Sequence, residues 1–141
     1  MPTLYLSLGT NLGDRRSNLE TALTLIGQRI GTVQSTSSIV ETEPWGFESP
    51  NRFLNMVAKV QTGMDPLDVL HTAQEIEKQM GRTVKSSNNV YHDRIIDIDI
   101  LLYDGLVLKT HELTIPHPLM YKRSFVMQPL AEIAPDLIKN V

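Results

Sequence analysis

The chain contains no cysteine, which excludes disulfide bonds and thiolate metal sites. No apolar run approaches the roughly 18 residues of a membrane-spanning helix, and the N-terminus lacks the charged-then-apolar pattern of a secretion signal. Basic residues are outnumbered, 13 against 16 acidic ones, so the charge provides no basic surface for nucleic acid or an anionic membrane. We therefore expect a cytoplasmic protein that binds neither nucleic acid nor membranes.

The sequence does contain enough apolar material for a core, because 41% of its 141 residues are hydrophobic. That amount fits one compact domain over residues 1–141. Alternating and β-branched segments predict strands over 3–8, 32–40, 53–62 and 93–103. Helical spacing predicts two helices, with buried stripes of Leu19, Ala22, Leu23, Ile26 and Ile30, then Leu67, Leu70, Ala73, Ile76 and Met80.

Local residue chemistry predicts where these elements begin and end. Gly31 is expected to end the first helix, because glycine is common just past a helix C-terminus. Asp65 is expected to cap the second helix and Pro66 to occupy its first position. Asp104 and Gly105 predict a tight turn that leads into a β-hairpin partner.

The predicted order is strand, helix, strand, strand, helix, strand, followed by the hairpin partner and a helical C-terminal tail. This order predicts an α+β fold with a ferredoxin-like βαββαβ core, in which a mainly antiparallel sheet carries helices on one face. The other face is then left for a site, although a fold alone does not define a function.

The last predicted strand carries two carboxylates, two residues apart. In a strand, Asp97 and Asp99 share one face, and Ile96, Ile98 and Ile100 share the other. The two acids repel each other unless positive charge lies between them. Mg²⁺ binds readily to one or two carboxylates together with water and phosphate oxygens, so the pair indicates a metal-bridged phosphate site. An exposed strand face that carries two acids explains the pattern equally well.

Cationic residues flank the acidic strand on both sides. Arg82, Lys85 and Arg94 precede it in a polar loop, and guanidinium groups neutralise phosphate oxygens in a fork geometry. His117 follows it in a proline-rich turn, where an imidazole can donate a hydrogen bond to a phosphate oxygen. Three cations are also common in an ordinary surface loop, and a histidine beside prolines is often only a turn residue.

A second cluster combines aromatic rings with amide and carbonyl groups. The segment 41–47 contains Trp45 and Phe47, and Phe53 and Asn55 follow it. Flat rings that stack and amides that form hydrogen bonds together suit a planar heterocycle. The alternative interpretation is that Trp45 and Phe47 cover the edge of the core.

Two common motifs are absent. Residues 9–13 read Gly-Thr-Asn-Leu-Gly and match neither the dinucleotide-binding nor the phosphate-loop glycine pattern. No serine stands in a nucleophile elbow. The sequence therefore supports neither a Rossmann or P-loop nucleotide site nor a serine hydrolase.

Several ordered motifs give the chain a resemblance to a known family. They are Leu8–Leu12, Glu43–Gly46, Phe53–Asn55, Gln74–Glu77, Gly81–Arg82, Arg94–Ile100, Leu113–His117 and Arg123–Phe125. On these motifs the chain resembles the 6-hydroxymethyl-7,8-dihydropterin pyrophosphokinases of folate biosynthesis. The resemblance covers nearly the whole length and implies transfer of diphosphate from ATP to a pterin alcohol, with release of AMP.

The resemblance also implies a role for each matching residue. Asp97 and Asp99 would hold two Mg²⁺ ions on the triphosphate, and the catalytic residues Arg82 and Arg94 would neutralise charge during transfer. ATP would be surrounded by Leu70, Gln74, Glu77, Lys85, Ile100, Thr114, His117 and Arg123. The pterin slot would be formed by Thr42, Pro44, Trp45, Phe53, Asn55 and Phe125.

The chain departs from the family pattern at two places. Many members carry Trp-Gly-Pro-Arg before the acidic strand, where this chain has Tyr-His-Asp-Arg at 91–94. Tyr91 could replace that tryptophan as a cover over the pterin, within a basic loop that is expected to act as a lid. Pro118 stands where an aromatic residue often lies against the nucleotide.

The expected reaction is attack of the pterin's hydroxymethyl oxygen on the β-phosphorus of ATP, in a Mg²⁺-dependent monomeric enzyme. Positioning and charge neutralisation carry such transfers, so no general base is assigned. A different Mg²⁺-dependent transferase with an Asp-x-Asp motif would not explain the pterin-like slot. An RNA-binding module would need aromatic ribonucleoprotein motifs and a basic surface, and the sequence has neither.

Overall fold

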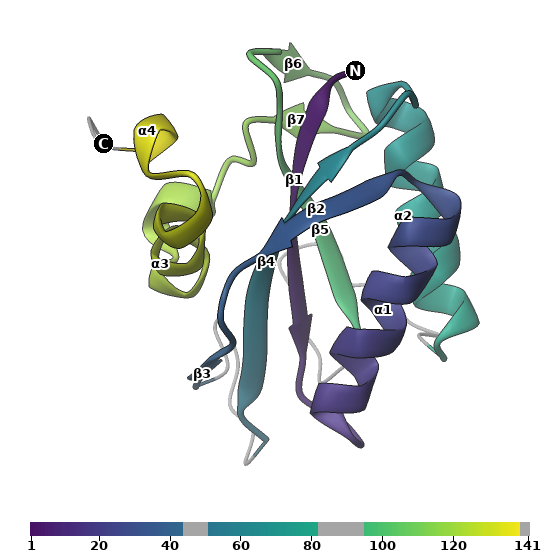
Figure 1. Cartoon of the computed structure of the whole chain (residues 1–141), viewed down its shortest axis with the longest axis vertical. Helices are drawn as coiled ribbons and strands as arrows, with labels where there is room; N and C mark the ends of the chain where they lie inside the picture. The colour runs from purple at the N-terminus through teal and green to yellow at the C-terminus, as the bar shows by residue number, and fades with distance from the viewer. Residues whose placement is uncertain (44–50, 82–94, 139–141) are drawn as a thin grey trace.

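The computed structural model describes residues 1–43, 51–81 and 95–138. Figure 1 shows a main sheet with helices packed against it, a small two-stranded sheet beside it, and a helical end at the C-terminus. The elements are β1 (Thr3–Thr10), α1 (Arg15–Arg29), β2 (Thr32–Thr36), β3 (Val40–Thr42), β4 (Phe53–Gln61), α2 (Pro66–Gln79), β5 (Asp97–Tyr103), β6 (Leu108–Lys109), β7 (Thr114–Ile115), the 3₁₀ turn η1 (Met120–Lys122), α3 (Ser124–Ile133) and α4 (Pro135–Ile138).

The main sheet has the order β2-β4-β1-β5, and β3 pairs with β4. Every pairing in this sheet is antiparallel, as the sequence predicts. β1 and β4 therefore lie in the middle, and β5 forms an edge of the main path. In the register, Gly9 of β1 lies between Asn55 of β4 and Asp97 of β5, so three strands contribute to one row across the sheet.

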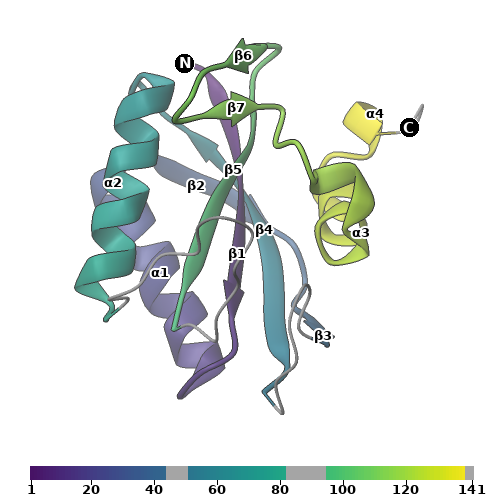
Figure 2. The same ribbon diagram turned by 180° about the vertical axis from the view of Figure 1, so that it is seen from behind.

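Helices cover both faces of the sheet, to different extents. α1 and α2 lie on one face, and α3 and α4 lie on the opposite face (Figures 1 and 2). Leu4, Leu6 and Leu8 belong to the core under α1 and α2. Tyr5 and Val57 belong to a smaller core with the buried residues of α3. Among the residues described, no helix is long and apolar enough to cross a membrane.

Local chemistry explains where α1 begins and ends. The side chain of Asp14 accepts a hydrogen bond from the Ser17 N–H at 3.1 Å and so caps the first turn. Three apolar side chains are buried at helical spacing, namely Leu19, Ala22 and Ile26. The helix ends at Arg29, and Gly31 lies so close to β4 that a Cβ there would be 2.1 Å from the carbonyl oxygen of Gln61.

α2 begins as predicted but buries a different stripe at its start. Asp65 occupies the N-cap position, although its side chain makes no capping hydrogen bond, and Pro66 occupies the first position. The prediction for Leu67 is wrong, because its side chain is 38% exposed, whereas Val69 is fully buried. Val69 shares a face with Ala73 and Ile76, and Leu67 lies about 160° away from Val69 around the helix axis.

The strand predicted over 32–40 is two strands, β2 and β3, because residues 37–39 break the ladder. Ser37 donates its N–H to the Val57 carbonyl at 2.9 Å, and its hydroxyl accepts the Val57 N–H at 2.9 Å. Ser38 then donates its N–H and its hydroxyl to the carboxylate of Glu132 in α3, at 2.8 and 2.7 Å. Two hydrogen bonds between Ser37 and β4 and two from Ser38 to α3 therefore replace continuous pairing.

The hairpin predicted after β5 also has a different partner. In the part of the chain that the structure describes, β6 pairs with β7 and not with β5. The turn itself is tight, with Asp104 at a positive φ of 47°. The Asp104 side chain accepts the Thr3 N–H at 2.7 Å, which ties this turn to the start of β1.

β5 contains one residue more than its partner strand requires. The β1–β5 register shifts between Tyr5 and Leu6, which leaves Leu101 without a partner in β1. Leu101 and Leu102 both pack into the core under α3, whereas Tyr103 packs against the core under α1 and α2. The bulge therefore sends two consecutive residues of β5 to the same layer.

Candidate active site

The candidate site lies on the sheet face opposite α1 and α2. It occupies the part of that face outside the core under α3. The register places Asn55, Gly9 and Asp97 in one row, and Ser7 beside Asp99 in the next row. Side chains in register share a face of the sheet, so an amide and two carboxylates point to the same side. The predicted sidedness of the acidic strand is confirmed, because Ile98 and Ile100 are buried in the opposite layer.

Gly9, at the centre of this row, has no side chain, so no Cβ lies between the side chains around it. A Cβ at Gly9 would lie 3.0 Å from Oδ1 of Asn55 and 3.5 Å from Cδ1 of Phe53. The two β4 side chains therefore occupy the space above Gly9. The sequence interpretation gave Gly9 no role, although a glycine at a strand end often marks a close approach.

The predicted pterin residues Thr42 and Asn55 are in direct contact. Nδ2 of Asn55 donates to the Thr42 hydroxyl at 2.8 Å and lies 3.5 Å from the Val40 carbonyl oxygen. Asn55 is 4% exposed, so these bonds fix its amide plane. Phe53, also predicted, pairs with Thr42 in the β3–β4 register. Three predicted slot residues are thus brought together by one pair of strands.

The N-terminal end of α3 brings a cation, the N-cap residue Arg123, and a ring near the acidic strand. Nη1 of Arg123 lies 3.9 Å from Oδ2 of Asp99, and the guanidinium carbon lies 5.7 Å from the centre of the Phe125 ring. Arg123 is 9% exposed, so its charge is poorly screened by solvent. The charge of Arg123 therefore acts strongly on the acidic strand.

Asp97 and Asp99 can serve as metal ligands only together with other donors. Within residues 1–43, 51–81 and 95–138, no group of three His, Asp or Glu side chains is arranged to hold a metal ion. Mg²⁺ commonly binds one or two carboxylates and takes its remaining ligands from water and phosphate oxygens. The donor set fits a cation that arrives with a phosphate substrate.

His117 lies beside β5, at the edge that does not pair with β1. Its N–H donates to the Leu101 carbonyl at 3.0 Å, and its Nδ1 accepts the Leu119 N–H at 3.2 Å. Burial lowers the pKa of His117 to about 4, with a smaller effect in the same direction from Arg123 and an opposing one from Asp97. The ring is therefore neutral at pH 7 with its proton on Nε2, and it can donate a hydrogen bond.

Glu77 reaches β5 from α2. Its carboxylate accepts the Ile98 N–H at 2.8 Å, and the residue is only 2% exposed. The predicted neighbours Leu70 and Gln74 are partly buried on the same helix. On the β5 side, Ile100 is 4% exposed and Thr114 lies in β7.

Several predicted residues fall on parts of the chain that the structure does not describe. They are Pro44, Trp45, Arg82, Lys85 and Arg94, together with the proposed lid and Tyr91. Their predicted roles stay predictions.

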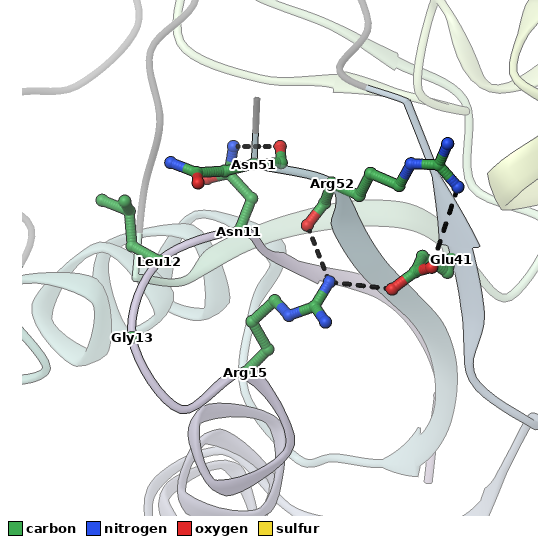
Figure 3. A pocket seen from close by; sticks show the side chains of 7 residues that line it. All are labelled: Asn11, Leu12, Gly13, Arg15, Glu41, Asn51 and Arg52. Carbon is green, nitrogen blue, oxygen red and sulfur yellow. Dashed lines mark hydrogen bonds and ion pairs between the residues drawn. The ribbon is translucent and has the colours of Figure 1, made fainter. Parts of the chain in front are cut away.

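A polar pocket of about 400 Å³ lies next to the slot, at the N-terminal end of α1 (Figure 3). Glu41, on its wall, pairs with Leu54, whose side chain belongs to the core under α1 and α2. The pocket therefore lies on the other side of the β3–β4 ladder from Thr42. It is lined by Asn11, Leu12, Gly13, Arg15, Glu41, Asn51 and Arg52.

The fold and the site define a small α+β protein that presents an amide and aromatic rings beside an acidic strand. Residues 5–135 match the family model of 7,8-dihydro-6-hydroxymethylpterin-pyrophosphokinase (HPPK). The chain belongs to this family of pyrophosphokinases, and the predicted resemblance is confirmed.

Two relatives illustrate the match. The 2-amino-4-hydroxy-6-hydroxymethyldihydropteridine pyrophosphokinase of Porphyromonas gingivalis is 51% identical over 138 residues, which is 97% of this chain and 94% of that protein. The Bacillus subtilis protein of the same name is 41% identical over 137 residues, 96% of this chain and 80% of that protein.

A solved structure agrees in fold. Plasmodium falciparum HPPK-DHPS, solved with STZ-DHP, superimposes with a TM-score of 0.70 at 20% identity. The match covers 93% of this chain and 39% of that chain, so this chain spans well under half of the solved protein. At this identity the likeness concerns the fold alone.

Proposed function

We propose that this chain transfers diphosphate from ATP to 6-hydroxymethyl-7,8-dihydropterin, in folate biosynthesis, with release of AMP. The observation that carries the proposal is the row Asn55–Gly9–Asp97. It sets an amide that suits a heterocycle and a carboxylate that suits a metal–phosphate group on either side of one glycine. Two substrates bound at the two ends of this row would meet above Gly9.

The ATP side is built on β5. We assign Asp97 and Asp99 to two Mg²⁺ ions, which when bound neutralise phosphate oxygens and polarise the reacting ones. Arg123 and the neutral His117 add a fixed positive charge and an Nε2–H donor for non-bridging oxygens. The remaining proposed contacts to ATP, including the two catalytic arginines, are Leu70, Gln74, Glu77, Ile100, Thr114, Arg82, Lys85 and Arg94.

The pterin side is built on β3 and β4. The Asn55 amide is fixed by its bond to the Thr42 hydroxyl and so is oriented before a ligand arrives. Phe53 and Phe125 supply ring faces for a planar heterocycle, as Pro44 and Trp45 are expected to do. The nucleophile is the hydroxymethyl oxygen, and no side chain is assigned as its base.

We further propose that residues 1–141 form one ferredoxin-like domain that acts as a cytoplasmic monomer. The strand order β2-β4-β1-β5, with all pairs antiparallel and α1 and α2 on one face, supports the ferredoxin-like plan. Light scattering after size-exclusion chromatography tests the monomer, because a mass near twice 15.9 kDa would contradict it.

The activity is tested with ATP, Mg²⁺ and 6-hydroxymethyl-7,8-dihydropterin, by chromatography of the nucleotides. We expect AMP to form only when both the pterin and Mg²⁺ are present. Formation of ADP, or AMP production that does not depend on the pterin, would refute the assigned reaction.

A further inference from the structure

The two strands that carry Thr42 and Phe53 end their pairing at these residues. Thr42 and Phe53 are the last registered pair of β3 and β4 at this end. Among the described residues no registered pair continues the ladder beyond them, so contacts from other elements can restrain the spacing of the strand ends. Thr42 and Asn55, which touch at 2.8 Å, lie next to this end of the ladder.

Arg15, the first residue of α1, supplies such a restraint. Its Nη1 donates to Oε2 of Glu41 and to the backbone carbonyl of Arg52, both at 3.0 Å (Figure 3). Glu41 directly precedes Thr42, and Arg52 directly precedes Phe53. One guanidinium nitrogen therefore bridges the two chain segments at the mouth of the slot.

Neighbouring contacts reinforce this bridge. Nδ2 of Asn11, a residue only 2% exposed, donates to the Asn51 carbonyl at 3.1 Å. The Arg52 guanidinium lies 3.0 Å from Glu43 and 3.9 Å from Glu41. The Arg52 side chain is 59% exposed, whereas that of Arg15 is 34% exposed and comes from a different element. Arg15 is thus the better-shielded restraint and couples α1 to the slot.

We propose that Arg15 is a positioning residue for the pterin substrate, acting through Glu41 and the Arg52 carbonyl. It holds β3 and the start of β4 at the spacing that Thr42, Phe53 and Asn55 need to accept the ring. It touches neither substrate. This proposal rests on the assignment of the pterin slot made above.

The test measures steady-state kinetics and stability for Arg15→Gln and Arg15→Lys, with Arg29→Gln as the matched control. Arg29 lies in the last turn of the same helix, is 35% exposed and is paired with Glu75, so it loses a comparable surface ion pair away from the slot. We expect Arg15→Gln to raise the pterin KM about fivefold and to leave the ATP KM within about twofold of wild type.

Arg15→Lys is expected to raise the pterin KM as Arg15→Gln does, because the lysine side chain is one atom shorter than arginine up to Nη1 and its flexible ammonium does not reach both acceptors. Hydrogen exchange gives a readout independent of activity. The amides of 40–42 and 53–55 should exchange faster in Arg15→Gln and unchanged in Arg29→Gln. A pterin KM equal to that of Arg29→Gln, or an equal rise in both substrate KM values, would overturn the positioning role.

Asn55→Ala, measured in parallel, separates this proposal from the slot assignment. If Asn55→Ala leaves the pterin KM unchanged, the slot assignment itself is wrong. If Asn55→Ala raises it and Arg15→Gln does not, the slot stands and the role of Arg15 is rejected.

Discussion

Gly9 illustrates how one missing side chain shapes the site. The Asn55 amide is held by Thr42 at 2.8 Å, so it cannot easily retreat from an atom placed at Gly9. A Cβ at 3.0 Å from Asn55 Oδ1 is closer than an ordinary van der Waals contact. The glycine is therefore needed for the slot, and no positive φ at this residue accounts for it.

Gly9→Ala is expected to raise the pterin KM about tenfold, because it displaces the Asn55 amide, and to change the free energy of unfolding by less than about 1 kcal/mol. Steady-state kinetics and urea unfolding check this. Gly27→Ala is the control, since a Cβ there meets nothing within 4 Å and the residue lies inside α1. The control should stabilise the protein by roughly 0.5–1 kcal/mol. An unchanged pterin KM in Gly9→Ala would contradict the tight packing.

His117 predicts a pH dependence of stability. Its pKa is about 4 in the folded protein, against an ordinary value of 6.5, so on acidification the unfolded chain takes up the proton first. Stability from the neutral ring is complete above pH 6.5 and is lost progressively between about 6.5 and 4. The total loss is on the order of 3 kcal/mol.

Urea unfolding at several pH values should show this slope in the wild type and a flatter one in His117→Asn. His111→Gln is the control, because His111 is exposed and should keep the wild-type slope. A His117→Asn slope equal to that of the wild type would contradict the assignment.

At the scale of elements, β5 is held by hydrogen bonds along the edge that does not pair with β1. The Ile98 N–H bonds to Glu77 of α2, and the Leu101 carbonyl accepts the His117 N–H. Both bonds satisfy backbone groups that an edge strand would otherwise present to solvent or bury unpaired. α2 and the segment before η1 thus hold the strand that carries the two acids.

Glu77→Ala should therefore destabilise the fold by about 1–3 kcal/mol, because it leaves the Ile98 N–H buried without this acceptor. Glu77→Gln keeps an acceptor oxygen and is expected to cost less. The exposed Glu75→Ala on the same helix is the control and should change stability by less than about 1 kcal/mol. Urea unfolding measures all three. Equal effects of Ala at 75 and 77 would show that the Ile98 bond contributes little.

Sequence reasoning succeeded where the deciding contacts are local. The period of two in 96–100 assigned the acids to one face, and Asp65 and Pro66 fixed the start of α2. It failed where the partner is distant in sequence. The break after β2 depends on Ser37 bonding to Val57, and the buried place of Glu77 depends on the Ile98 N–H. Neither partner can be identified from periodicity.

At the scale of the whole molecule, the larger core and the candidate site lie on opposite faces of the sheet. The layer under α1 and α2 holds the larger core, while the acids lie on the other face with half-buried side chains. The two acids repel each other, and the Arg123 guanidinium, 3.9 Å from Asp99, offsets part of this repulsion. The acidic strand therefore relies on neighbouring positive charge, to which a bound cation would add.

Asp97→Asn is expected to reduce turnover at least about a thousandfold, because a proposed Mg²⁺ ligand is lost. Its melting temperature without ligands should stay close to that of the wild type, since the amide keeps the shape of the carboxylate and can still form hydrogen bonds. Mg²⁺ with a non-hydrolysable ATP analogue should raise the melting temperature of the wild type but not of the variant. Asp68→Asn, exposed on α2, is the control. Near-normal turnover in Asp97→Asn would refute the metal role.

The bulge at Leu101 has a consequence for what this strand can support. Because Leu101 has no partner in β1, the consecutive residues Leu101 and Leu102 both pack into the core under α3, and Tyr103 returns to the core under α1 and α2. Regular alternation would not allow two adjacent side chains of one strand to support the same layer. A single inserted residue thus lets one short strand carry the two acids and anchor α3 on the same face of the sheet.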